Sequence, residues 1–180
     1  MFKKIIASLL TFGIILIPFT ANASSHAKSL QNLGMEEIMF AQMMIPHHEQ
    51  AIAMSEIALK TSRNQAILKL SNQIKSLQSS EKSQLAYWLK ATDSSMTMDH
   101  DMNMPGMLTT KELASLKRLA GTKFDRTFLQ LMIKHHQGAL EMLDLISDSR
   151  NVEAKALAKS IKSAQSKEIT SMKLLLNKLK

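Results

Sequence analysis

The sequence contains the stretch Phe40-Ala41-Gln42-Met43-Met44-Ile45-Pro46-His47-His48 and repeats it as Phe128-Leu129-Gln130-Leu131-Met132-Ile133-Lys134-His135-His136. The similarity continues beyond both stretches, since Ala51 and Met54 match Ala139 and Met142 in the same register. After a slip of one residue, the segment 74–81 matches the segment 161–168. So long a match indicates an internal duplication of a unit of about fifty residues.

Both copies are expected to be helical, because Gly and Pro are rare after residue 24 and strand-like alternation is absent. We predict four long helices and one short helix, over residues 35–60, 64–90, 110–120, 123–147 and 152–179. The short helix is expected to be capped by Thr109 or Thr110 and to stop at Gly121, and the first long helix to kink at Pro46. Each copy is then a helical hairpin with an Arg-Asn turn. Because one amphipathic hairpin cannot bury its own apolar face, the two copies are predicted to form a four-helix bundle.

The N-terminal residues have the pattern of a secretory signal peptide. Lys3 and Lys4 form a basic start, residues 5–19 are almost wholly apolar, and small residues precede a cleavage site after Ala23. A retained membrane anchor is the less favoured alternative, because the apolar run is shorter than the roughly 20 residues that a spanning helix needs. We therefore expect a periplasmic or secreted chain with no membrane contact after cleavage. The predicted organisation is a signal peptide (1–23), a flexible N-terminus (24–34) and a single domain (35–180), which contains repeat one (35–91), a Met-rich loop (92–108), the short helix (109–121) and repeat two (122–180).

The composition of the chain limits its partners and its metal ligands. The formal net charge is +8, but the lysines are spread along the predicted helices and there is only one Trp and one Tyr. Nucleic acid is therefore not expected as a partner. The chain has no cysteine, so it has no disulfide framework, and a metal ion must be held by His, Met or carboxylate side chains.

The duplicated segment places thioether and imidazole side chains at helical spacing. Residues four apart on a helix are neighbours. This spacing predicts three Met–His pairs: Met43 with His47, Met44 with His48, and Met132 with His136. His47 and His135 are expected to point into the bundle, and His48 and His136 to lie at the edge of that face. Thioether and imidazole donors together select copper, above all Cu(I), over hard ions such as Mg²⁺ and Ca²⁺. The alternative is that these side chains are ordinary core residues.

A methionine-rich segment separates the two copies. Within residues 96–107 it contains six candidate soft ligands: Met96, Met98, His100, Met102, Met104 and Met107. A flexible segment with Met-x-Met spacing can wrap a cation that prefers few, soft ligands, without a preformed cage. The alternative is a low-complexity linker that tucks its methionines over the mouth of the bundle.

The segments 43–54 and 125–142, with their Met-Ile-x-His-His core, resemble the signature of the bacterial domain of unknown function 305 family. The resemblance covers residues from about 35 to 178. It implies a ferritin-like four-helix fold and an exported protein, with some relatives linked to copper binding and resistance. Carried over by position, it implies a metal site formed by Met44, His47, His48, Met54, Asp125, Met132, His135, His136 and Met142. Leu131 stands where the first copy has Met43, so the two halves need not bind metal equally.

Three functions are compatible with these features. The favoured one is a periplasmic copper-binding protein that is not an enzyme. It binds Cu(I), and Cu(II) as a second state, and either sequesters the ion or passes it to another periplasmic copper-handling protein. In this way it contributes to copper tolerance. The first alternative is a metal-independent periplasmic interaction or chaperone-like module. The least favoured is a ferritin-like di-iron oxidase, which needs Glu-x-x-His pairs. The positions where those glutamates would stand hold Met44, Ile45, Met132 and Ile133.

Overall fold

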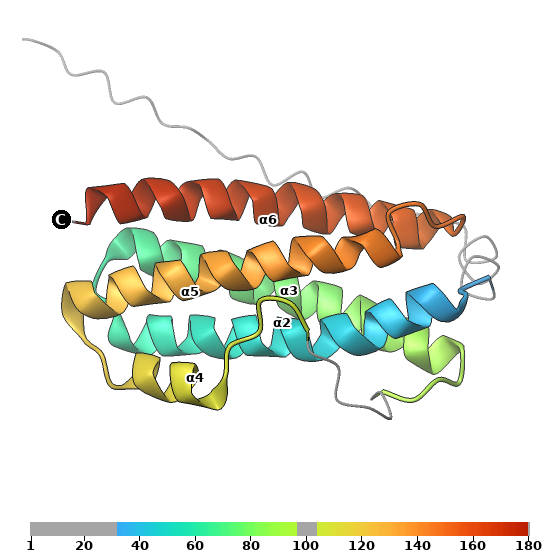
Figure 1. Ribbon diagram of the computed structural model, residues 1–180, viewed down its shortest axis with the longest axis horizontal. Coiled ribbons are helices and arrows are strands. Elements are labelled where there is room, and N and C mark those ends of the chain that lie inside the picture. Colours follow the sequence, from blue (N-terminus) through green and yellow to red (C-terminus); the bar gives the residue numbers. More distant parts are fainter. Residues whose placement is uncertain (1–31, 97–103, 180) are drawn as a thin grey trace, which may run out of the picture.

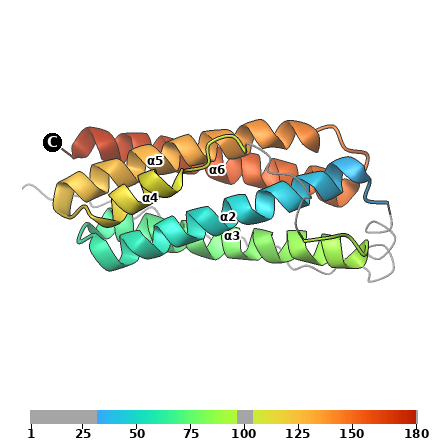
Figure 2. The same ribbon diagram turned by 60° about the horizontal axis from the view of Figure 1, so that its bottom comes forward.

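The structure, a computed structural model, describes residues 32–96 and 104–179, and within these ranges it is helical with no strand. Four long helices lie side by side in Figure 1: α2 (Met35–Thr61), α3 (Gln65–Ala91), α5 (Gly121–Met142) and α6 (Val152–Lys178). The short helix α4 (Thr110–Lys117) lies beside α5 on the outside of the bundle, as Figure 2 shows, and a 3₁₀ turn η1 (Leu143–Leu145) follows α5. The predicted all-helical bundle is therefore confirmed.

The two Arg-Asn turns begin the second helix of each hairpin. The side-chain oxygen of Asn64 accepts a hydrogen bond from the amide of Ala66 at 3.0 Å. That of Asn151 accepts from the amides of Glu153 and Ala154. Asparagine suits this position because its oxygen satisfies amides that have no partner inside the helix. The same residue type therefore starts α3 and α6, as the duplication predicts.

The short helix ends earlier than predicted. Thr109 caps α4, with Glu112 completing the capping box, but α4 ends at Lys117 and not at Gly121. Gly121 is instead the first residue of α5, with a φ of +57°. Glycine adopts this left-handed conformation without a steric penalty, so Gly121 forms the bend between the two helices. At its other end, α5 stops at Met142, where the 3₁₀ turn replaces the last predicted helical turn.

Two buried hydrogen bonds connect the two hairpins, one from the turn of each hairpin to the other hairpin. Ser62, in the turn of the first hairpin, donates to a carboxylate oxygen of Asp125 at 2.7 Å. Ser149, in the turn of the second hairpin, donates to Glu37 on α2. Glu37 and Asp125 occupy matching positions in the two copies, and so do the two serines. The hairpins therefore exchange the same contact, as two copies related by an approximate two-fold axis would.

A layer of polar side chains divides the apolar core into two clusters. One cluster contains Phe40, Trp88 and Ile146, and the other contains Ile67 and Phe124. Each long helix contributes to both clusters, and near its middle it contributes polar residues. We call these residues the polar layer: His47, His48, Gln78, Glu81, His135, His136, Gln165 and Glu168. Buried polar groups are costly unless they are partnered, so the layer needs an explanation beyond folding.

Some predicted features lie outside the described residues. These are the signal peptide with its cleavage site after Ala23, residues 24–31, and Met98, His100 and Met102 of the loop. Met96, Met104 and Met107 of the same loop are described. Among the helices in the described ranges, none is both long enough and apolar enough to cross a membrane.

Candidate metal centre

The four histidines of the duplicated segments meet in the middle of the bundle. His47 and His48 come from α2, His135 and His136 from α5, and all four are 0% exposed. The rings of His47 and His135 lie with their centroids 3.8 Å apart and their planes tilted by 41°. The inward position predicted for these two residues is confirmed. Helix α2 is continuous through Pro46, so this proline does not displace the histidines from the layer.

His48 and His136, which were predicted to lie at the edge of this inward face, are fully buried there. The quarter-turn that separates them from the α2–α5 contact places each beside the second helix of its own hairpin, which covers it. Nε2 of His48 lies 3.0 Å from Oε2 of Glu81 on α3. Nε2 of His136 lies 2.8 Å from Oε2 of Glu168 on α6. Each half of the bundle therefore contains one His–Glu pair in which the histidine is fully buried.

The partners of the rings indicate which nitrogen carries the proton in three of the four histidines. The carbonyl oxygen of Pro105 lies 3.0 Å from Nε2 of His47, and a carbonyl can only accept, so Nε2 donates. The glutamate oxygens beside Nε2 of His48 and of His136 favour a proton at the same atom. A ring of this tautomer has its free lone pair at Nδ1.

The Nδ1 atoms of all four histidines are buried and have no hydrogen-bond partner of normal geometry. Leaving such an atom unpaired costs about 1–3 kcal/mol. A metal-ligating histidine has this arrangement, with one nitrogen free for the metal and the other donating to a carboxylate or carbonyl. The hydrogen bonding of these imidazoles is therefore that of metal ligands. Within the described part of the chain, no three His, Asp or Glu side chains are grouped so that they hold one ion by themselves.

Burial keeps the two central imidazoles neutral. Burial lowers the pKa of His47 from its ordinary value of 6.5 to about 4. The hydrogen bond to Pro105 raises this pKa, but by less, and the charges of the neighbouring histidines lower it further. Burial, followed by the charges of the other three histidines, holds the pKa of His135 well below 6.5. Because the neutral ring is the form that binds metal, these two rings are ready for an ion at neutral pH.

Buried methionines lie on both sides of the layer. Met43, Met44 and Met142 belong to one apolar cluster. Met54 and Met132 belong to the other. Thioether sulfur is a soft donor, and its combination with imidazole favours copper over ions that prefer oxygen. Soft donors are therefore available above and below the histidines.

The described end of the methionine-rich loop is held across the layer. Besides the bond from His47 to Pro105, the side chain of Gln50 accepts from the amide of Leu108 at 2.7 Å and donates to its carbonyl at 3.0 Å. A Cβ added at Gly138 would lie 2.0 Å from the carbonyl oxygen of Pro105, so the loop approaches α5 only because this residue is glycine. Figure 1 shows this segment passing over the middle of α2, beside α5, on its way to α4.

Two kinds of predicted ligand lie away from the layer. Asp125 is about three turns, or about 16 Å by helical rise, from His136, and its carboxylate bonds to Ser62. Met96 is 48% exposed beyond the end of α3. By contrast, Met104 and Met107 belong to the end of the loop that is held across the layer. Both are partly buried, and Met104 packs against the apolar cluster that contains Met44.

Sequence reasoning missed the acidic residues of the layer. Glu81 and Glu168 lie in the matching segments of the two copies, and each is a charged residue beside an otherwise uncharged helix face. Gln78 and Gln165 are repeated in the same way, and both are buried with amide atoms that have no hydrogen-bond partner. A polar residue that recurs on the buried face of both copies was the signal that could have found them.

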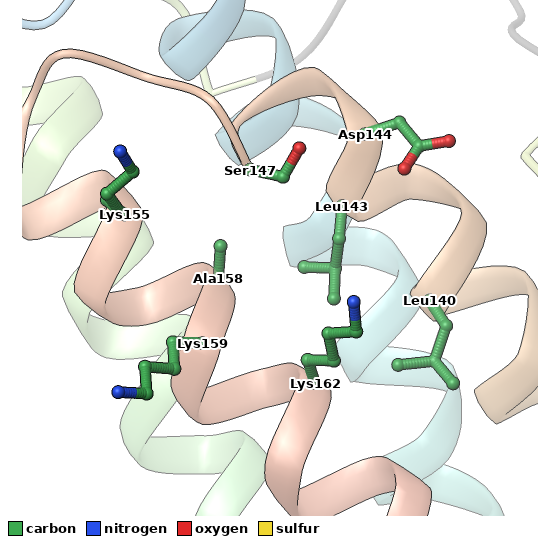
Figure 3. A pocket seen from close by; sticks show the side chains of 8 residues that line it. All are labelled: Leu140, Leu143, Asp144, Ser147, Lys155, Ala158, Lys159 and Lys162. Atoms are coloured by element: carbon green, nitrogen blue, oxygen red, sulfur yellow. The ribbon is translucent and has the colours of Figure 1, made fainter.

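A separate cavity of about 300 Å³ lies between α5, η1 and α6. Figure 3 shows Lys155, Lys159 and Lys162 of α6 on one side, and Leu143 and Ser147 on the other. None of the residues that line this cavity is a histidine or a methionine. The cavity is therefore not part of the candidate metal centre.

Comparison with known proteins gives a family and several solved structures. Residues 37–176 match the family described as Domain of unknown function (DUF305). A DUF305 fragment from Deinococcus radiodurans is 30% identical with a TM-score of 0.75, over 81% of this chain and 97% of that one. A DUF305 protein from Streptomyces coelicolor, described as secreted, is 28% identical with a TM-score of 0.77, over 80% and 93%. CopM in its Cu(I)-bound form is 28% identical with a TM-score of 0.66, over 79% and 96%, and it has also been solved with Cu(II) and with Ag. Among curated proteins, none matches the chain.

Proposed function

We propose that this chain, which belongs to the DUF305 family, is an exported protein that binds copper at the polar layer, Cu(I) in preference to Cu(II), and that it is not an enzyme. The protein sequesters the ion or passes it to a second copper-handling protein of the same compartment, and so contributes to copper tolerance. The methionine-rich loop captures or delivers the ion, and the bundle holds it.

The observation that carries this proposal is the state of the imidazoles. His47, His48 and His136 each have Nε2 beside an oxygen acceptor and a buried Nδ1 with no partner. A layer with a purely structural role would pair both nitrogens, since each unpaired one lowers stability. A metal ion at Nδ1 removes that cost and leaves the contacts of Nε2 with its oxygen neighbours in place.

The assignment to copper is supported by the other donors and by one relative. The layer is flanked by thioether sulfur, and its two glutamates face imidazole nitrogens that already engage them. Soft sulfur with imidazole is the donor set that copper prefers. CopM, which has a similar fold, has been solved with Cu(I), Cu(II) and Ag bound. Export is supported by the signal-peptide pattern of residues 1–23.

Long-range ¹H–¹⁵N spectroscopy of the imidazoles, with and without Cu(I), tests the proposal. We expect the Nδ1 signals of His48 and His136 to shift on copper addition, while Nε2 keeps the signature of a protonated donor. The double variant His48→Gln, His136→Gln should bind fewer Cu(I) ions, and Cu(I) or Ag(I) should raise the melting temperature of the wild type where Mg²⁺ does not.

His26→Gln is the matched control, because His26 lies outside the duplicated segments. It should bind as many Cu(I) ions as the wild type. If the double variant also binds the same number of ions, or if Mg²⁺ and Cu(I) stabilise the wild type equally, the layer is not a copper site. A metal-independent interaction module would then be the better function.

A further inference from the structure

Four soft donors follow one another along α2 at intervals of four residues. They are Met35, Met39 and Met43, followed by His47 of the polar layer. Each step of four residues advances about 6 Å along the helix and turns about 40° around it, so consecutive side chains are neighbours. We call Met35, Met39 and Met43 the methionine row. The row runs from the first turn of α2 to the layer.

Burial increases along the methionine row. Met35 is 84% exposed, Met39 is partly buried, Met43 is 7% exposed and His47 is fully buried. Core packing accounts for Met39 and Met43, which belong to or contact the same apolar cluster. It does not account for Met35, which buries little of its surface. A graded series of this kind connects solvent with the layer through thioethers.

The second copy lacks the methionine row. The matching positions hold Lys123, Thr127 and Leu131. Helix α5 nevertheless packs into the bundle and brings His135 to the layer fully buried. Thioethers at these positions are therefore not required for a hairpin to fold or for its histidine to reach the layer.

We propose that the methionine row is the path by which Cu(I) reaches the polar layer. This inference rests on the proposed copper function. Met35 takes the ion from solvent or from a donor, and Met39 and Met43 pass it inward to the imidazoles. At each step a copper–sulfur bond to the next thioether forms as the previous bond breaks. The ion stays Cu(I) throughout, and no electron or proton is transferred. Cu(I) accepts few, soft ligands, so a chain of single thioethers is sufficient for each exchange.

The double variant Met35→Leu, Met39→Leu tests the path, because leucine keeps the apolar volume and removes the sulfur. The measurement is stopped-flow transfer of Cu(I) from a coloured chelator, bicinchoninate, to the mature protein. We expect the loading rate constant to fall by about tenfold, within the range over which association rates vary among variants of one site. The number of Cu(I) ions bound at equilibrium should not change.

Two further variants control this result. Met172→Leu removes a fully buried thioether from α6, away from the row, and should load at the wild-type rate. The triple variant Lys123→Met, Thr127→Met, Leu131→Met builds the row on α5 and should load faster than the wild type. A triple variant that loads no faster than the wild type counts against the path.

A second readout follows the sulfur atoms directly. With methyl-¹³C methionine and Ag(I) added beyond the amount that the layer holds, the methyl signals of Met35 and Met39 should shift, because the excess ions then occupy the methionine row. Unshifted signals, or a Met35→Leu, Met39→Leu variant that loads at the wild-type rate, would overturn the path while leaving copper binding in place. Failure of the function itself shows separately, as unchanged copper binding after substitution of His48 and His136.

Discussion

The two hairpins carry the same polar groups to the layer but differ in what surrounds those groups. In the first hairpin His48 pairs with Glu81, and in the second His136 pairs with Glu168. Outside these pairs the copies diverge. The methionine row exists only on α2.

The loop also contacts the two hairpins differently. Gln50 in the first copy bonds to the backbone of Leu108. At the matching position of the second copy, Gly138 lets the carbonyl of Pro105 approach α5. The features that both copies keep are those that position the imidazoles. The features that are found in only one copy determine how the layer connects to the loop and to solvent.

The shared layer predicts the largest effect, a loss of stability of the metal-free protein in acid. In the unfolded chain His47 and His135 take up protons near pH 6.5, whereas in the folded protein the lowered pKa of His47 keeps it neutral to about pH 4. Between these values the unfolded state binds more protons, so stability falls as the pH falls. At about 1.4 kcal/mol per pH unit, His47 alone accounts for about 3 kcal/mol, and His135 adds to it.

Urea unfolding at pH 7.0 and pH 4.5 measures this loss. In the variant His47→Gln, His135→Gln the difference between the two pH values should become much smaller. A wild type that is equally stable at both pH values would mean that the central imidazoles are protonated in the folded state.

The loop contact predicts the second-largest effect, at Gly138→Ala. The added Cβ cannot fit 2.0 Å from the Pro105 carbonyl, so the loop must leave α5 and His47 loses its acceptor. We expect a loss of about 3 kcal/mol in the free energy of unfolding, from overpacking and the lost hydrogen bond, despite the better helix propensity of alanine. Gln50→Ala, at the matching position, removes hydrogen bonds without a clash and should cost less. Equal costs would show that the close approach at Gly138 is not specific to the second copy.

The reciprocal contacts between the hairpins predict a smaller effect that is the same on both sides. Ser62→Ala and Ser149→Ala each leave a buried carboxylate without its hydroxyl partner, so each should lower stability by about 2 kcal/mol. Thermal unfolding of the two variants measures whether the two losses of stability are equal.

Asp125→Asn should leave the copper stoichiometry unchanged. Asp125 lies about 16 Å along α5 from His136, and its carboxylate is bonded to Ser62. Loss of copper in that variant would restore Asp125 as a ligand.

Features that depend on local rules could be predicted from the sequence. The duplication, the Arg-Asn turn of each hairpin and the inward position of His47 follow from the repeat and from helical periodicity, which are properties of short segments. The family resemblance added the fold, which the structural relatives bear out.

Features that depend on contacts between distant segments could not be predicted in the same way. The helical period places His48 a quarter-turn from the main contact, but it does not say that Glu81, on another helix, covers it. The turn at Gly121 resembled a helix stop, because glycine in a left-handed conformation is common just after a helix ends. Here the same conformation, with a φ of +57°, stands at the first residue of α5. The docking of Pro105 beside Gly138 depends on the loop, and no periodic pattern marks it.

The smallest expected effect distinguishes the two hairpins most directly. Met43 is buried beside the layer, whereas Leu131 occupies the matching position, so the first half has one more thioether near its imidazoles. Met43→Leu and Leu131→Met are nearly volume-conserving exchanges and should each change stability by less than about 1.5 kcal/mol. Their effects on copper should be opposite: Met43→Leu weakens Cu(I) binding, and Leu131→Met strengthens it, each by about tenfold for one soft ligand lost or gained. Competition with a chelator of known affinity measures the Cu(I) affinity of both variants. The combined variant should have the wild-type affinity, but its tighter-binding half should be the hairpin that contains α5. If both single variants bind Cu(I) as the wild type does, the sulfur at this position is packing and the two halves bind alike.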